Sequence, residues 1–89
     1  MRLDVFLKRV GLCKQRTLAK GLCDGGRVRM DGVTAKAGKE VTPGRTLEIE
    51  LRREILKIEI TDLPGRNYRR EDGEAFYTVI ERAENDLFS

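Results

Sequence analysis

The chain has 89 residues, of which 37% are charged and 39% are hydrophobic, and its mean hydropathy is −0.48. This length allows one domain with a small core, and this balance of residues excludes an intrinsically disordered protein. No apolar run approaches the roughly 18 residues of a membrane span, and the first residues lack the charged and apolar regions of a signal peptide. We therefore expect a cytoplasmic protein that does not contact a membrane.

Charge is distributed unevenly along the chain. Residues 1–45 contain eleven Lys and Arg against four Asp and Glu, a net charge of +7, whereas residues 46–89 contain seven against eleven, a net charge of −4. A local positive potential on a soluble domain is typical of proteins that bind polyanions. On composition alone, a purely solubilising role of these cations is the alternative.

Two short helices are predicted in the basic half. Four apolar residues at the spacing of one helical face open the chain: Leu3, Phe6, Leu7 and Val10. This period predicts a helix with one buried face, and Gly11 ends it at a C-terminal cap. A second helix is expected over 14–24, where the start lacks a short acceptor side chain and Gly25 and Gly26 follow the end. Its expected inner face consists of Leu18, Leu22 and Cys23, and Ala19 is small enough for close helix approach.

Short strands and turns are expected next. Residues 27–30 predict a strand that closes in an Asp31-Gly32 turn, and a short strand follows over 33–36. Residues 38–44 form a turn-rich link. Three cations lie in or beside this link: Lys36, Lys39 and Arg45.

Two longer strands carry the acidic half. Residues 46–52 and 56–60 alternate apolar and polar side chains, which is the period of a strand with one buried face, and residues 52–54 form the bend between them. The expected inward side chains are Leu47, Ile49, Leu51, Leu56, Ile58 and Ile60.

The last third of the chain is less regular. Residues 66–75 predict a mobile charged loop. Residues 76–80 are aromatic and β-branched, so we predict a strand that pairs with 56–61, with a short helix as the alternative. Residues 81–89 are predicted to form a polar tail.

Patterns typical of catalysis or metal binding are missing. The chain has no histidine, its one serine is Ser89, and it has no glycine-rich phosphate loop. Cys13 and Cys23 are interpreted as small reduced apolar residues, because two thiols without a histidine do not make a usual zinc site. Glu48 and Glu50 alternate with apolar residues, as on a solvated strand face. We therefore expect no enzyme activity, no cofactor and no metal.

Several separated motifs resemble the S4 RNA-binding domain of ribosomal, tRNA-synthetase and pseudouridine-synthase proteins. They are Arg2-Leu3-Asp4, Gly11-Leu12, Arg16 with Ala19, the run from Gly26 to Gly32, and Val41-Thr42-Pro43-Gly44. The chain departs from the family pattern where Lys14 and Gln15 stand in place of serines. It also has Asp31 where the family has asparagine and Arg45 where it has aspartate.

The resemblance implies an α+β fold of the S4 type. In this fold two short N-terminal helices pack on a small, mainly antiparallel sheet, and a C-terminal strand or helix extends it. We divide the single domain, residues 1–89, into an S4 RNA-binding core over 1–50 and a strand hairpin over 51–89 that carries the charged loop 66–75 and the tail. Within the family, the chain most resembles the small free-standing S4 proteins of bacterial ribosome quality control. The heat-shock S4 protein that handles stalled large subunits is the near neighbour.

The same resemblance implies the partners. We expect a monomer that binds rRNA of the large ribosomal subunit and the peptidyl-tRNA of a stalled nascent chain, next to an alanine-tailing factor of the RqcH type. Arg16 is the expected principal contact, and Arg27 and Arg29 are expected to extend the same basic patch. The predicted RNA-binding residues are Arg2, Asp4, Lys8, Lys14, Arg16, Lys20, Arg27, Arg29 and Lys36.

Two other function classes fit parts of the pattern. Two helices separated by Gly11 are compatible with a helix-turn-helix that binds DNA, although Gln15 is the main base-reading side chain on the second helix. A protein-interaction module that uses the acidic strand faces is the other alternative. Aromatic stacking platforms are scarce in the basic half, which favours recognition of folded RNA through its backbone and shape.

Overall fold

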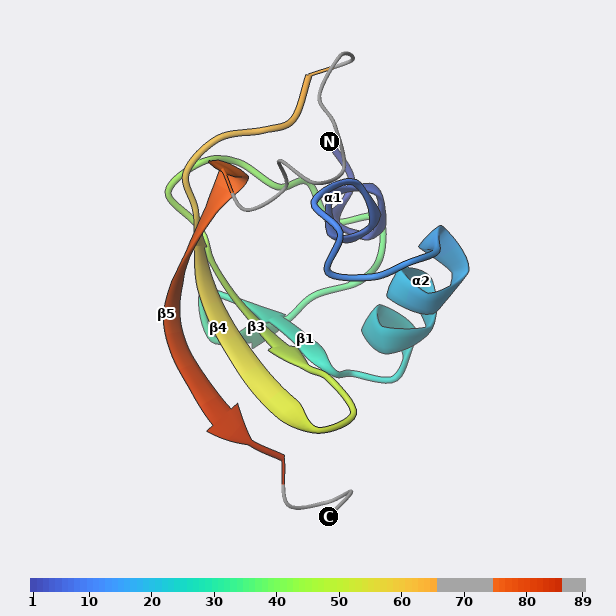
Figure 1. Cartoon of the computed structure of the whole chain (residues 1–89). Helices are drawn as coiled ribbons and strands as arrows, with labels where there is room; N and C mark the ends of the chain where they lie inside the picture. The colour runs from blue at the N-terminus through green and yellow to red at the C-terminus, as the bar shows by residue number, and fades with distance from the viewer. Residues whose placement is uncertain (66–74, 86–89) are drawn as a thin grey trace.

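Two short helices cover one face of a five-stranded antiparallel sheet in the computed structural model (Figure 1), which describes residues 1–65 and 75–85. The helices are α1 (Leu3–Arg9) and α2 (Arg16–Asp24). The strands are β1 (Val28–Met30), β2 (Val33–Thr34), β3 (Thr46–Glu50), β4 (Glu54–Ile60) and β5 (Tyr77–Glu84). Their order in the sheet is β2-β1-β3-β4-β5. The predicted α+β fold is confirmed, and its C-terminal extension is a strand.

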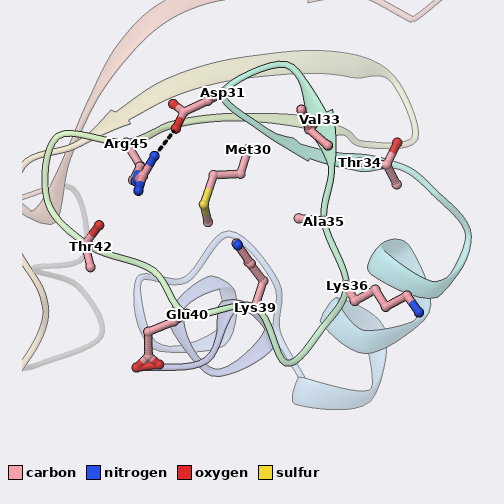
Figure 2. Close-up of a pocket in the computed structure, with 10 residues that line it drawn as sticks. All are labelled: Met30, Asp31, Val33, Thr34, Ala35, Lys36, Lys39, Glu40, Thr42 and Arg45. Atoms are coloured by element: carbon pink, nitrogen blue, oxygen red, sulfur yellow. Dashed lines mark hydrogen bonds and ion pairs between the residues drawn. The ribbon is translucent and has the colours of Figure 1, made fainter.

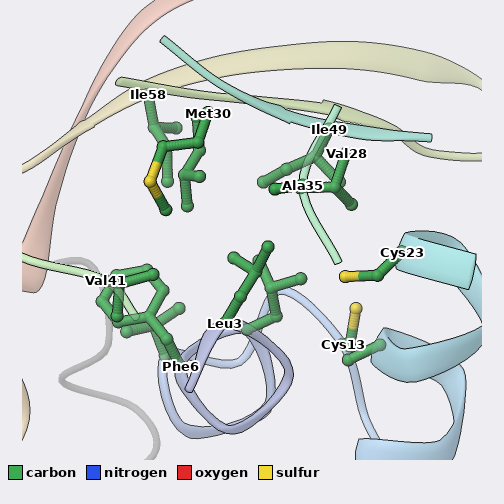
Figure 3. Packing of buried hydrophobic residues seen from close by; sticks show 14 of the residues in the cluster. Leu3, Phe6, Cys13, Cys23, Val28, Met30, Ala35, Val41, Ile49 and Ile58 are labelled. Atoms are coloured by element: carbon green, nitrogen blue, oxygen red, sulfur yellow. The ribbon is translucent and has the colours of Figure 1, made fainter. Parts of the chain in front are cut away.

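Helix α1 packs on the sheet with the face that its apolar period predicts. Leu3, Phe6 and Leu7 are fully buried, and Val10 is nearly so. Figure 3 shows Leu3 pointing from α1 toward the strands. The chain then turns at Gly11, whose φ of 82° is a conformation that glycine adopts without the steric cost of a Cβ atom.

Helix α2 differs from its prediction in two ways. It begins at Arg16 rather than near residue 14, after an extended Gln15. Its buried residues are Ala19 and Cys23, whereas Leu18, predicted to point inward, is 52% exposed. Neighbouring residues of a helix point about 100° apart, so the small Ala19 can face the core only if Leu18 turns toward solvent. Close packing of α2 through its small residues therefore overrides the predicted leucine face.

The inner face of the sheet supplies a large part of the core. Its buried residues are Val28, Met30, Leu47, Ile49, Leu56, Ile58 and Ile60. The strand register places Val28 opposite Ile49, and Ile49 opposite Leu56, so that the apolar residues of successive strands meet on one face. The intervening polar residues point to the opposite face, which we call the outer sheet face.

The two cysteines lie at the edge of this core, where their sulfur atoms point toward each other (Figure 3). Both are free, and burial raises the pKa of each thiol to about 11. A thiol with such a pKa stays protonated at neutral pH and is a poor nucleophile. Cys13 and Cys23 thus fill space as apolar residues, as the sequence predicted.

The β1–β2 hairpin closes in the predicted turn. Asp31 and Gly32 have φ angles of 51° and 84°, and a two-residue hairpin turn of this kind needs positive φ at both positions. Strand β2 ends at Thr34, earlier than expected, because Ala35 turns into the core and the chain leaves the sheet.

Strand β5 is longer than predicted. The prediction of a strand that pairs with β4 is confirmed and the helical alternative is wrong, because Tyr77–Glu84 pairs with Glu54–Ile60, with one register shift between Lys57 and Ile58. The expected polar tail is wrong for residues 81–84, since β4 offers unpaired backbone groups that these residues satisfy. Asn85 is buried and donates from Nδ2 to the carbonyl of Leu51 at 2.9 Å. The charged loop predicted over 66–75 falls almost entirely outside the described residues, and so does the rest of the tail.

In the described part of the chain, neither helix is long and apolar enough to cross a membrane. The same residues contain no group of three or more His, Cys, Asp or Glu side chains that could hold a metal ion.

Candidate nucleic-acid interface

A buried carboxylate organises the basic surface at the start of α1. Asp4 lies in the first turn of that helix and is only 1% exposed. Its oxygens accept hydrogen bonds from Nε and Nη2 of Arg2, at 3.2 and 3.4 Å, and from Nε of Arg16, at 3.1 Å. The backbone N–H of Val5 donates a further bond at 2.9 Å. One carboxylate therefore joins the N-terminus of the chain to the first residue of α2.

These bonds keep Asp4 ionised. Burial alone would raise the pKa of the Asp4 carboxyl, but hydrogen bonds from Arg16, Arg2 and the Val5 N–H outweigh it. The pKa of Asp4 consequently lies below its ordinary value of 3.8. At neutral pH the carboxylate is charged, and it holds both guanidinium groups in place.

The two arginines still have capacity to bind an anion. The side chain of Arg2 is 50% exposed and that of Arg16 is 54% exposed. A guanidinium has five N–H donors, so the bonds to Asp4 leave several donors on each arginine. Two cations share one anion, which gives this cluster a net positive charge, and its fixed planar groups suit bidentate contact with phosphate. We call Arg2, Asp4 and Arg16 the arginine pair site.

A loop extends the arginine pair site on one side. The backbone N–H of Leu3 donates to the carbonyl of Lys39 at 2.9 Å, and that of Asp4 donates to Ala37 at 3.1 Å. Gly38 lies close to Arg2, as a Cβ atom added to Gly38 would be 3.8 Å from Nη2 of Arg2. The loop carbonyls thus occupy N–H groups at the start of α1, and the loop backbone on which Lys36 and Lys39 lie packs against this end of the helix.

The other predicted cations on the helices lie nearby. Lys8 follows Asp4 by one turn of α1, and Lys20 follows Arg16 by one turn of α2, so each extends one side of the arginine pair site. Both lysines are exposed, and so is Lys14 just before α2. The structure therefore brings most of the predicted residues together on the helical side of the domain.

Arg29 and Arg27 lie elsewhere, so the single patch predicted for them and Arg16 does not form. Val28 and Met30 are buried, and strand alternation directs Arg29 to the outer sheet face. There it donates to Glu48 at 2.8 Å and to Glu50 at 2.9 Å, and these bonds raise its pKa.

Arg27 follows the C-terminal end of α2, whereas Arg16 begins that helix. The nine residues of α2 span about 13 Å, which separates the two arginines.

Lys39 is the residue that the site prediction missed. The sequence placed it in a turn-rich link, but its contact with α1 depends on how residues 36–40 fold back on the N-terminus. Gly38, directly before Lys39, was the available signal for a close backbone approach. The link between Asp4 and Arg16, twelve positions apart, likewise depends on the packing of α1 against α2.

Comparison with known proteins places this geometry in a family. The sequence model of the S4 domain family matches residues 1–47, the segment that contains both helices and the loop. An RQC P-site tRNA stabilizing factor of Halalkalibacterium halodurans is 42% identical over 79 residues, 89% of each chain. The protein of the same name from Bacillus subtilis is 36% identical over 80 residues, 90% of this chain and 92% of the relative.

Two solved structures share the fold. Heat Shock Protein 15 of Vibrio cholerae, described as trimeric, superposes with a TM-score of 0.81 at 25% identity, over 89% of this chain and 80% of that chain. The solution structure of the hypothetical protein HP1423 gives a TM-score of 0.75 at 36% identity, over 91% of this chain and 98% of that chain. The chain therefore belongs to the S4 domain family and, within it, to the family of RQC P-site tRNA stabilizing factors.

Proposed function

We propose that this protein binds RNA on the large ribosomal subunit through the arginine pair site and stabilises the tRNA in the P site during ribosome quality control. The observation that carries the proposal is the buried Asp4, which holds two half-exposed arginines in one orientation. The relatives named as RQC P-site tRNA stabilizing factors, which match about nine tenths of the chain, support the same function.

The chemistry of the arginine pair site suits folded RNA. Guanidinium groups grip phosphates through paired N–H donors, and the surrounding lysines add a sequence-independent attraction. In the described residues the aromatic side chains are Phe6, Phe76 and Tyr77, none of which lies at this site. Base stacking on aromatic rings is thus not available there, and recognition depends on the backbone and shape of the RNA.

The family resemblance supports a more specific role on the stalled subunit. The protein acts without catalysis in the bacterial cytoplasm, where it contacts both rRNA and peptidyl-tRNA on a subunit blocked by a stalled nascent chain. It works there with an alanine-tailing factor of the RqcH type. Two RNA phosphates can be bound at once by this cluster, because the side chains of both arginines are half exposed.

The test compares two arginines of equal exposure. Arg16→Ala removes one member of the arginine pair site, and Arg82→Ala removes an arginine of β5 that is 56% exposed and paired with Glu54. Tagged copies of both variants and of the natural protein are used to recover ribosomal particles from cells. We expect the natural protein and the Arg82 variant to recover large subunits that carry peptidyl-tRNA, and the Arg16 variant to recover about tenfold fewer. Equal recovery by the two variants would contradict the proposal.

A recycling role like that of the heat-shock S4 protein is the second candidate, because the Heat Shock Protein 15 structure superposes over most of the chain. The recovered particles separate the two functions. Nascent chains with added alanine tails support the quality-control role, whereas untailed chains on the same particles favour recycling. Duplex DNA that competes as well as ribosomal RNA for the natural protein would instead favour the helix-turn-helix alternative.

A further inference from the structure

Residues 30–45 line a cavity, open to solvent on one side, beside the arginine pair site. Its volume is about 660 Å³, and Figure 2 shows the chain forming a ring around it. Its lining includes Met30, Ala35, Lys39 and Arg45. Sites for small organic ligands commonly have volumes of roughly 300 to 1,000 Å³, so one nucleotide has room here.

The floor of this cavity is apolar and its rim is cationic. Met30 and Ala35 are only 6% and 5% exposed, and Figure 2 shows the Met30 side chain pointing into the ring. In the same view the Lys39 ammonium also points inward, whereas Lys36 points away. A ligand that fits this arrangement has a flat apolar part and an anionic part.

The carboxylates of the ring are already engaged. Glu40 binds the N-terminal ammonium of Met1 at 2.6 Å. Asp31 accepts hydrogen bonds from Arg45 at 2.8 Å and from the N–H of Thr46 at 3.0 Å. No carboxylate in residues 1–65 or 75–85 pairs with Lys39. The rim therefore keeps a positive charge that can attract a phosphate.

The cavity lies next to the arginine pair site. The backbone carbonyl of Lys39, a residue on the cavity rim, accepts the hydrogen bond from the Leu3 N–H, and the neighbouring Gly38 lies close to Arg2. An RNA strand bound by Arg2 would therefore pass next to Gly38 and Lys39, at the mouth of the cavity.

From this arrangement we infer that the cavity holds one unstacked nucleotide of the bound RNA, with the base against Met30 and Ala35 and the phosphate next to Lys39. This inference rests on the proposed function for the source of the nucleotide. A base that leaves its stack needs an apolar surface to replace its neighbours, and apolar side chains can supply it. A free inorganic anion would use only the rim, and the buried floor would have no role.

Nuclear magnetic resonance on the isolated protein tests the inference directly. The protein, labelled at amide nitrogen and at methyl carbon, is titrated with AMP and separately with UMP, and ribose 5-phosphate is the control without a base. We expect saturable shifts of the Met30 and Ala35 methyl signals and of the Lys39 amide with either nucleotide, and little change at the two methyl groups with ribose 5-phosphate. Equal methyl shifts with all three probes, or nucleotide shifts confined to Arg2 and Arg16, would overturn it.

Two variants define the expected specificity. Lys39→Ala should weaken nucleotide binding about fivefold, because it removes one exposed charge from the rim. Arg82→Ala, on the distant strand β5, should leave it unchanged. The spectra report whether each variant is folded, and Lys39→Gln replaces Lys39→Ala if the latter is not. Undiminished nucleotide binding by the folded Lys39 variant counts against the inference. Because this assay contains no ribosome, its failure leaves the subunit recovery experiment, and thus the proposed function, to be judged separately.

Discussion

The arginine pair site and the outer sheet face use the same chemistry in opposite proportions. On the helical side, two arginines share the single carboxylate of Asp4. On the outer sheet face, the single Arg29 is held by two carboxylates, Glu48 and Glu50. The first cluster has a net charge of +1 and the second of −1. The domain can therefore attract phosphate on one side and repel it on the other while its overall charge stays small, at +3.

Burial strengthens this difference. Asp4 is hidden from solvent while its arginines are half exposed, so the positive groups form the accessible surface. Arg29 is less exposed, at 28%, and its two glutamates, 34% and 20% exposed, flank it on the neighbouring strand. Which sign of charge faces the solvent thus depends on which partner is buried as well as on how many charges each cluster contains.

The largest expected effect comes from removing both arginines of the pair site. Arg2→Ala with Arg16→Ala should lower the affinity for ribosomal RNA about 100-fold at moderate salt, because two charge-assisted phosphate contacts are lost. The dependence of log affinity on log salt should become shallower by about two, since fewer counterions are released. Filter binding over a range of salt concentrations measures both. A variant with the natural salt slope would mean that the arginines do not contact phosphate.

Replacing the shared carboxylate should affect stability and binding together. Asp4→Ala leaves two guanidinium groups without their common acceptor and removes four hydrogen bonds, so we expect a loss of about 2 kcal/mol in the free energy of unfolding. Folded protein at low temperature should also bind RNA about tenfold more weakly, because the arginines lose their fixed orientation. Urea titration and filter binding measure the two effects. Normal RNA binding by the folded variant would limit Asp4 to a structural role.

The loss of stability at acid pH should depend on Asp4. Because its pKa in the folded protein is lowered, the stabilisation is fully present above the ordinary value of 3.8 and is lost as the pH falls below it. The side chain introduced by Asp4→Asn cannot ionise, so the free energy of unfolding of this variant should fall less steeply than that of the natural protein between pH 5 and pH 2. The raised pKa of Arg29 adds nothing in this range, since it titrates far above it. Parallel curves for the two proteins would show that Asp4 is not linked to acid unfolding.

The smallest effect is expected on the outer sheet face. Arg29→Ala should lower the free energy of unfolding by about 1 kcal/mol or less, because it leaves Glu48 and Glu50, two neighbours on the same face of β3, without their common cation. RNA affinity should change by less than about twofold, since the arginine pair site is untouched. Thermal melts and filter binding on one preparation check both statements. A tenfold loss of RNA affinity would instead indicate that RNA binds at the outer sheet face.

The amino-acid sequence by itself determined the local features of this protein. The helical period of Leu3, Phe6 and Leu7 and the alternation through Leu47 and Ile49 specified which faces are buried, and the structure confirms them. These patterns are readable because side chains repeat every 3.6 residues in a helix and every two in a strand. The same local rules failed for Leu18, where close packing through Ala19 outweighed the leucine pattern. They also failed for residues 81–84, where the open edge of β4 required a pairing partner.

Only the tertiary structure decided how the cations are shared among partners. Arg16 reaches Asp4 across twelve positions because α2 packs on α1, and Arg29 reaches Glu48 and Glu50 across 19 and 21 positions because β1 pairs with β3. A local period states which way a side chain points but not what it meets there. The sequence could therefore predict a basic half, whereas the separation into one side that attracts phosphate and one side that repels it depends on long-range packing and strand register.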